Sequence, residues 1–265
     1  MTRVISGAVL ALVAIAIVWL APPLLFFVAA EGLVLLGARE YAGLTRGITP
    51  TVPSWLVSAA AAVTCAAVWR STGDPGVVLL ALLAVFAAVG TAALAGWRGG
   101  PDALASVAAA AFPSLYLGLP IGALVLIRAE QGAAGLFLLM ATVMISDTAQ
   151  YYTGRTFGRR PLAPTISPKK TMEGAVGGFV FGAAAFALLG ERWLADPAWS
   201  LPLRAALGVL IVAAGIAGDL FESMLKRSAG VKDSSSLIPG HGGVLDRIDA
   251  LLFTAPVYFV ALAYL

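Results

Sequence analysis

The sequence predicts an all-α, polytopic integral membrane protein with about nine transmembrane helices and a cytoplasmic N-terminus. Of its 265 residues, 60% are hydrophobic and only 12% are charged, and the mean hydropathy is +0.93. Soluble chains carry roughly 25% charged residues. The apolar runs are continuous and rich in Ala and Leu, without the alternation of a membrane β-barrel. This composition also excludes intrinsic disorder, and the lone Cys65 excludes a disulfide-stapled fold.

Nine apolar segments are candidates for the spans, because a helix needs about 20 such residues to cross a hydrocarbon core about 30 Å thick. They are residues 4–20, 24–38, 54–70, 76–96, 103–127, 133–152, 174–194, 203–225 and 245–264. The first two are short and adjoin at Ala21-Pro22-Pro23, so a re-entrant hairpin is an alternative for them. The first also resembles the apolar part of a signal peptide, but no A-x-A site follows, and we expect it to be retained.

Lysine and arginine are unevenly divided between the two sides that nine spans define. The side with the N-terminus and the even-numbered loops receives 13 of the 17 basic residues, and the other side receives 4. The positive-inside rule therefore predicts a cytoplasmic N-terminus and an outward C-terminus, with the polar loops of the second half facing the cytoplasm. The net charge of +3 is explained by the same excess of basic residues in the predicted cytoplasmic loops. So few charges cannot cover a duplex-binding face, and we expect no nucleic-acid partner.

The chain divides into two dissimilar parts. Residues 1–130, with about five of the helices, have short loops that are poor in charge. Residues 131–265 form the predicted catalytic transmembrane bundle with two cytoplasmic loops. Residues 219–249 alone hold 9 of the 31 charged residues. No internal repeat relates the two parts, which argues against an inverted-repeat transporter.

The end of the eighth segment carries a polar stripe. Asp219, Glu222, Ser223 and Lys226 are spaced i, i+3, i+4 and i+7, so they share one helical face, and Arg227 follows. A carboxylate at membrane depth costs about 2.5–3.5 kcal/mol on insertion scales. Two on one stripe therefore indicate a wet cavity, a metal or a cation. The alternative is an internal ion pair of Asp219 or Glu222 with Lys226.

The loop after this helix combines cations, hydroxyls, glycines and carboxylates. Glycines on both sides of the single histidine allow the backbone to approach phosphate oxygens closely. Two aspartates lie three residues apart where the ninth helix begins, and carboxylate oxygens are ligands that Mg²⁺ prefers. Helix capping is the alternative for either aspartate alone. The loop residues concerned are Lys232, Asp233, His241, Gly242, Gly243, Asp246, Arg247 and Asp249. Together with Lys226 and Arg227, they predict a site for a divalent metal and a polyphosphate.

A third polar stretch surrounds the sixth and seventh segments. Asp147 lies near the cytoplasmic end of the sixth, and Lys169 and Lys170 precede the seventh. The cations between them are explained either as a positive-inside anchor or by attraction to anionic lipid head groups. Glycines repeat every four residues at 174, 178 and 182, which favours close helix packing. No P-loop, G-x-G-x-x-G or H-E-x-x-H motif occurs.

The loop motif resembles the signature of phosphatidate cytidylyltransferases, also called CDP-diacylglycerol synthases. The resemblance covers 27 residues: Ser223-x-x-Lys226-Arg227-x₄-Lys232-Asp233-x-Ser235-x₂-Ile238-Pro239-x-His241-Gly242-Gly243-Val244-x-Asp246-Arg247-Ile248-Asp249. The segments Ser146-Asp147-Thr148 and Ser167-Pro168-Lys169-Lys170-Thr171-x-Glu173-Gly174 are also similar to that family. Met172 stands where we would expect an aromatic residue.

The resemblance implies transfer of CMP from CTP to phosphatidic acid, with release of pyrophosphate, at the inner face of the cell membrane. It implies Mg²⁺ as cofactor, and a second cation is compatible with it. By resemblance, Asp219 and Asp246 bind the metal, with Asp249 and Glu222 as supports. The catalytic set comprises Asp219, Asp246, Lys226 and Arg227. The substrate-binding set comprises Ser223, Lys232, Asp233, His241, Gly242, Gly243, Arg247, Asp147, Lys169 and Lys170.

The expected partners are CTP, phosphatidic acid and the lipid bilayer, and a homodimer is compatible with the sequence. Two other functions remain open. A CTP-dependent lipid kinase would use the same metal and nucleotide but transfer the γ-phosphoryl group. An ion-coupled transporter would use Asp147 and Asp219 as intramembrane carboxylates.

Overall fold

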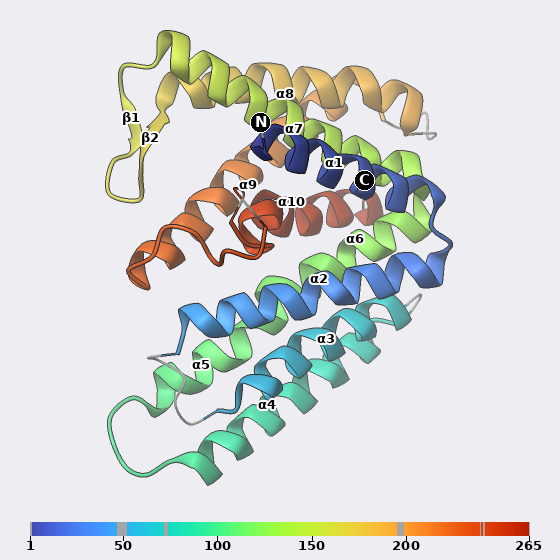
Figure 1. Ribbon diagram of the computed structural model, residues 1–265. Coiled ribbons are helices and arrows are strands. Elements are labelled where there is room, and N and C mark those ends of the chain that lie inside the picture. The colour runs from blue at the N-terminus through green and yellow to red at the C-terminus, as the bar shows by residue number, and fades with distance from the viewer. Residues whose placement is uncertain are drawn as a thin grey trace. The chain divides into compact units, whose positions relative to one another are not determined.

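The computed structural model describes residues 2–46, 52–71, 74–194, 199–238, 240 and 242–264, and this part of the chain is helical apart from its loops and one short hairpin (Figure 1). The chain forms two compact units. The first comprises Met1–Leu126 and Ala229–Arg247, and the second comprises Ile127–Ser228 and Ile248–Leu265. The described part of 229–247, which includes the start of α10, thus belongs to the same unit as the N-terminal helices.

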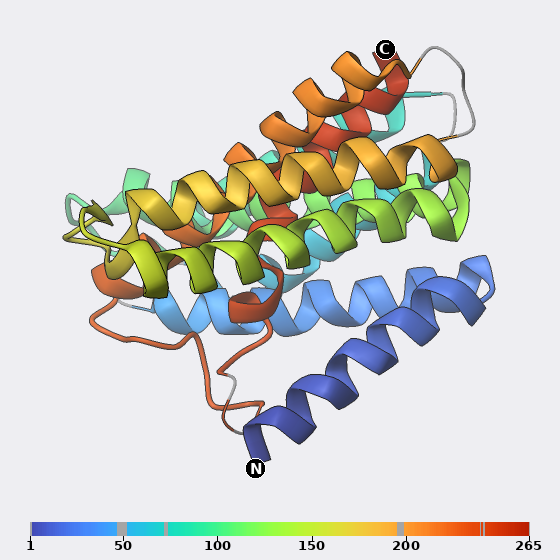
Figure 2. The ribbon, with the colours of Figure 1, turned by 90° about the horizontal axis from the view of Figure 1, so that it is seen from above.

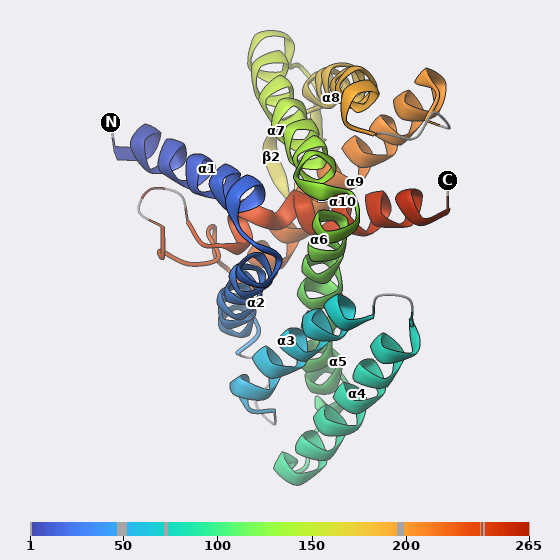
Figure 3. The ribbon, with the colours of Figure 1, turned by 90° about the vertical axis from the view of Figure 1, so that its right-hand side faces the viewer.

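The first unit is organised around α3. Its helices are α1 (Thr2–Leu20), α2 (Pro23–Leu44), α3 (Ser54–Arg70), α4 (Gly76–Gly96), α5 (Ala103–Pro113), η1 (Ser114–Gly118) and the start of α6 (Leu119–Glu130). Helix α3 lies between α2 and α4 and also contacts α5 and η1 (Figures 1 and 3). Its buried positions are mostly small residues such as Ala60 and Ala61, which permit close approach. Gly118 of η1 lies against Ala61 so closely that a Cβ would lie 2.6 Å from the Ala61 carbonyl oxygen.

The fifth predicted span is one helical stretch with a π-turn inside it. Pro113 ends α5, and Pro120 follows at the start of α6, so neither position has a backbone N–H to donate. In the π-turn between them, the Leu119 N–H donates to the Ser114 carbonyl, five residues back.

The second unit is a layer of packed helices with a β-hairpin at one end. It contains the end of α6, α7 (Gly132–Phe157), β1 (Pro161–Ala163), β2 (Ser167–Thr171), α8 (Met172–Trp193), α9 (Leu201–Ser228) and most of α10 (Leu245–Tyr264). Helices α7 and α8 run side by side, and α8 also packs on α9 (Figure 2). Strands β1 and β2 pair antiparallel, with Pro161 opposite Thr171. This short hairpin lies in the loop between the sixth and seventh predicted segments, and the apolar segments themselves form helices.

The glycine repeat in α8 is explained by packing, as predicted. A Cβ on Gly174 would lie 2.8 Å from the Gln150 carbonyl oxygen of α7. A Cβ on Gly178 would lie 2.5 Å from the Gln150 side chain, and one on Gly182 would lie 2.6 Å from Val212 of α9. Substitution at these positions would force α8 away from its neighbours.

All nine predicted apolar segments are helical within the described ranges, which supports the all-α class. Six helical stretches there are long and apolar enough to cross a membrane: α4, the continuous α5–η1–α6, α7, α8, α9 and α10. The described apolar part of α1, Val9–Leu20, and α3 are shorter. The count of nine spans, the side of the N-terminus and the division at residue 130 remain predictions.

Candidate active site

The β1–β2 hairpin carries the lysine motif and is fixed to α8 by side-chain caps. The Thr171 hydroxyl accepts a hydrogen bond from the Gly174 N–H at 3.1 Å, which caps α8. The Glu173 carboxylate accepts hydrogen bonds from the backbone N–H groups of Arg159 and Arg160 at 3.0 and 3.2 Å. Three residues of the predicted motif are therefore structural. They position the preceding strand, which presents Lys170.

Three aspartates of the second unit form what we call the aspartate cluster: Asp147 of α7, Asp219 of α9 and Asp249 of α10. Their charges interact with one another and with Lys170 of β2. Lys170 forms an ion pair with Asp219, and their side chains are 23% and 34% exposed. One ammonium group faces three carboxylates, so the cluster has an excess of negative charge when all three are ionised. Such a cluster attracts a cation.

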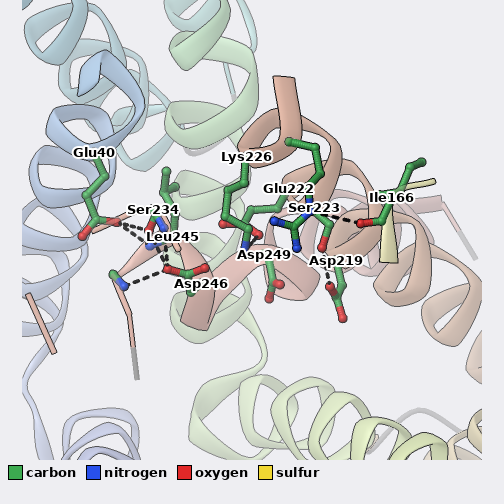
Figure 4. Close-up of polar contacts among 12 residues, drawn as sticks. Glu40, Ile166, Asp219, Glu222, Ser223, Lys226, Ser234, Leu245, Asp246 and Asp249 are labelled. Atoms are coloured by element: carbon green, nitrogen blue, oxygen red, sulfur yellow. Dashed lines mark hydrogen bonds and ion pairs between the residues drawn. The ribbon is translucent and has the colours of Figure 1, made fainter. Parts of the chain in front are cut away.

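Close packing of α9 on α10 brings two of these aspartates together. A Cβ on Gly218 would lie 2.6 Å from the Asp249 carbonyl oxygen, so only glycine permits this crossing. Asp219 follows directly in α9, and its Oδ1 lies 3.5 Å from the Ser223 hydroxyl (Figure 4). On α7, the Gln150 amide donates a hydrogen bond of 3.0 Å to Asp147 Oδ1. The cluster thus has polar neighbours from α7 and α9.

The rest of the predicted stripe on α9 is engaged in an ion pair. Glu222 is 1% exposed and pairs with Lys226 one turn later. A glutamate four residues before a lysine stabilises a helix more than the reverse order does. This is the alternative considered from sequence. Arg227 is exposed, and its Nε donates a hydrogen bond of 3.5 Å to the Ile166 carbonyl in the turn between β1 and β2 (Figure 4).

A second polar group belongs to the first unit, and we call it the serine–carboxylate network. It consists of Glu40 of α2, Ser234 and Ser235 of the loop, and Asp246 of α10 (Figure 4). Glu40 accepts hydrogen bonds from both serine hydroxyls, at 2.9 and 2.7 Å. Asp246 Oδ2 accepts from the N–H and the hydroxyl of Ser234 at 2.9 and 2.7 Å, and from the Gly243 N–H at 2.8 Å.

Asp246 therefore holds Ser234 and Gly243 of the loop against the first turn of α10, whereas capping of the helix was the alternative raised from sequence. A metal contact of Asp246 remains a prediction. The structure groups Asp219 with Asp147 and Asp249, and it groups Asp246 with Glu40.

The remaining charged residues of the predicted substrate-binding set are exposed: Lys232 and Asp233 in the loop after α9, Lys169 in β2 and Arg247 in α10. Gly242 has φ of +80°, a conformation that L side chains rarely adopt, and a Cβ there would lie 2.6 Å from Asp246 Oδ2. His241 lies outside the described residues. Gly242 therefore lies tightly against the carboxylate of Asp246, and Gly243 lies tightly against that of Glu40.

Glu40 was not among the residues predicted from the sequence. The predicted second segment ends at residue 38, directly before Arg39 and Glu40, so the glutamate received no role. In the structure α2 continues to Leu44, and Glu40 is only 7% exposed.

The similarity to known proteins extends over the whole chain. The sequence model of the cytidylyltransferase family matches residues 1–265. The chain belongs to the cytidylyltransferase family. This match includes the N-terminal helices, where the motif resemblance gave no information.

Three relatives illustrate the similarity. The chain is 42% identical over 125 residues to the phosphatidate cytidylyltransferase of Aquifex aeolicus, covering 47% of this chain and 46% of the relative. It is 49% identical over 127 residues to that of Synechocystis, covering 47% and 42%. It is 38% identical over 271 residues to the chloroplastic phosphatidate cytidylyltransferase 4 of Arabidopsis thaliana, covering 90% and 66%. The matched region thus spans between two fifths and two thirds of these relatives.

Proposed function

We propose that this cytidylyltransferase is a phosphatidate cytidylyltransferase, which transfers CMP from CTP to phosphatidic acid. The family match over the whole chain carries the proposal, and the names of the three relatives supply the lipid substrate. The aspartate cluster with Lys170 supports it, because nucleotidyl transfer requires charge neutralisation around a polyphosphate.

The reaction needs positioning more than covalent help. A phosphate oxygen of phosphatidic acid attacks the α-phosphorus of CTP and forms the new P–O bond. The bond between the α-phosphorus and the oxygen bridging to the β-phosphate breaks, and pyrophosphate leaves with that oxygen and its electron pair. The attacking phosphate is already anionic at neutral pH, so no general base is required. Holding the reactants in line and neutralising the triphosphate lower the barrier.

The donor chemistry of the aspartate cluster fits Mg²⁺, which prefers carboxylate oxygens and substrate phosphates. In the described part of the chain, no group of three or more His, Cys, Asp or Glu side chains is close enough to hold a metal ion as it stands. Asp219 is paired with Lys170, so metal binding in this cluster would require that pair to rearrange. We propose that Asp219 and Asp249 would hold the metal, with Asp147 as a support. The metal contact of Asp246 expected from the motif stays a separate proposal, because Asp246 lies in the serine–carboxylate network. When bound, Mg²⁺ would neutralise charge on the triphosphate.

Basic residues near the ends of α9 and β2 are proposed to bind the substrates' phosphates. Arg227 and Lys169 are exposed and cationic, and the positive-inside rule places their loops on the cytoplasmic side, where CTP is supplied. A site at helix ends lies level with the head group of phosphatidic acid in the bilayer. We therefore propose a multi-pass protein of the cell membrane whose site faces the cytoplasm.

Transfer of label from CTP to lipid tests this function. The purified protein is incubated in detergent with phosphatidic acid, Mg²⁺ and CTP labelled at the α-phosphate. The expected result is label in the lipid phase that requires both phosphatidic acid and Mg²⁺. Label in lipid only from γ-labelled CTP would identify a lipid kinase. Absence of both, with substrate flux into liposomes, would identify a transporter.

A further inference from the structure

Glu40 is a buried carboxylate whose hydrogen-bonding partners are about 200 residues away in the chain. Its side chain accepts four hydrogen bonds of 2.7 to 2.9 Å. Two come from the hydroxyls of Ser234 and Ser235, and two come from the backbone N–H groups of Val244 and Leu245. Four donors compensate a buried charge that would otherwise be costly.

The two backbone donors are at the start of α10. The first N–H groups of a helix have no partner within it, and they form the positive end of the helix dipole. Here Glu40 takes the N–H groups of Val244 and Leu245, and Asp246 takes that of Gly243. Two carboxylates thus satisfy three successive N–H groups. A residue of α2 therefore fixes where α10 begins.

Ser234 connects the two carboxylates. Its hydroxyl oxygen lies 2.9 Å from Glu40 Oε2 and 2.7 Å from Asp246 Oδ2. A hydroxyl has one proton, so the two acceptors compete for it. The Ser234 hydroxyl is thus the single group between the two carboxylates, and the position of the Asp246 side chain depends on Glu40 through it.

The space around Glu40 is filled. A Cβ on Gly243 would lie 2.1 Å from the Ser234 hydroxyl oxygen and 2.4 Å from Glu40 Oε2. Val244 and Leu245 are 6% and 0% exposed. The requirement for glycine at 243 in this loop is therefore explained by Glu40, in addition to any contact with phosphate.

We propose that Glu40 is a positioning residue of the active site: it fixes Ser234 and Ser235 to the start of α10 and thereby orients Asp246, for which the family motif predicts a metal contact. The proposal rests on the proposed function for its effect on catalysis. Glu40 itself need not contact substrate. Partners of this kind, which orient a catalytic group, typically change activity by about 10–100-fold when removed.

Glu40→Gln is the primary test, because it keeps the shape of the side chain but replaces one acceptor oxygen with a donor that faces other donors. The matched control is Glu31→Gln, nine residues earlier in α2, where the glutamate interacts with Cys65 of α3 instead. Backbone hydrogen exchange and CMP transfer are measured on both variants in the intact protein.

The expected result is faster exchange in residues 231–247 of Glu40→Gln and a fall in kcat of about 10–100-fold, with the KM for phosphatidic acid near that of the unchanged protein. Glu31→Gln should change neither. Unaltered exchange in Glu40→Gln would overturn the proposal. So would faster exchange with unchanged kcat, because Glu40 would then have a structural role only.

Ser235→Ala keeps the experiment decisive if Glu40→Gln does not fold. It removes one of the four donors and leaves Glu40 and both N–H contacts in place. We expect the same two changes at reduced size, and an unchanged loop would contradict the proposal. If the unchanged protein transfers no CMP, the proposed function fails, whereas the exchange data still decide whether Glu40 holds the loop.

Discussion

The serine–carboxylate network and the aspartate cluster use the same functional group in opposite ways. In the network, Glu40 and Asp246 are served by six neutral donors, four backbone N–H groups and two serine hydroxyls. In the cluster, Asp147, Asp219 and Asp249 share one lysine, and their charges repel one another. The first arrangement satisfies its charges with fixed dipoles, and the second leaves an excess of charge.

This difference separates carboxylates whose charge is satisfied by neutral donors from carboxylates whose charge is balanced only in part. A carboxylate saturated by neutral donors has its charge stabilised in one geometry. A cluster of like charges is stable only with a cation or a proton. Binding of a metal ion or another cationic group to such a cluster is therefore favourable, because it relieves the repulsion. The following predictions test whether the two groups behave differently.

The largest expected effect is at Asp219. Asp219→Asn removes charge from the centre of the aspartate cluster, and we expect CMP transfer to fall by about 10²–10³-fold, comparable to the loss of a major electrostatic contact in other enzymes. Because excess negative charge is relieved, the thermal midpoint should stay the same or rise. The control is Asp102→Asn, at the start of α5, where no side-chain cap is made. Activity close to normal in Asp219→Asn would eliminate the cluster as the centre of the reaction.

Lys170 should matter more than its neighbour. Lys170 is half-buried and paired with Asp219, whereas Lys169 on the same strand is exposed. We expect Lys170→Gln to reduce kcat by about 10–100-fold and Lys169→Gln to reduce it less, since a partner that orients a catalytic group is lost only in the first. Steady-state kinetics with both substrates measure this difference. Equal losses would show that the ion pair has no special role.

Gly218→Ala should separate the two aspartates that packing brings together. The added Cβ would lie 2.6 Å from a carbonyl oxygen of α10, and overpacking of this kind costs about 1–3 kcal/mol of stability. We expect a lower thermal midpoint and reduced activity. Gly90→Ala in α4 is the control, because nothing lies within 4 Å of its Cβ position. A fully active, equally stable Gly218→Ala protein would show that this crossing is not tight.

The smallest expected effect is at Thr171. Thr171→Ala removes the cap of α8 and should cost about 1 kcal/mol of stability. Activity should fall only slightly, because the hairpin is also held through Glu173. Thr171→Ser retains the hydroxyl and should restore the thermal midpoint. A loss of activity as large as that at Asp219 would mean that Thr171 contacts a substrate.

Local patterns were sufficient for the helices and for part of the site. Apolar runs of about 20 residues predicted nine helical segments, because the backbone must satisfy its own hydrogen bonds in lipid. The glycine repeat in α8 predicted close packing, since it depends only on spacing along one helix. Sequence reasoning placed Asp219 and Asp249 in one predicted metal site together with Asp246 and Glu222, and the last two make other contacts in the structure.

The role of each carboxylate was decided by tertiary structure. Glu222 and Asp219 look alike in sequence, yet one is buried with Lys226 and the other pairs with Lys170 of a hairpin that the sequence did not predict. Glu40 was overlooked because its partners are about 200 residues away. The sequence by itself determined an all-α membrane protein of the cytidylyltransferase type and the residues that carry charge. Only the fold decided which charges meet donors and which meet one another, because electrostatic energies depend on distance and burial, and contacts between distant segments leave no periodic signal in the chain.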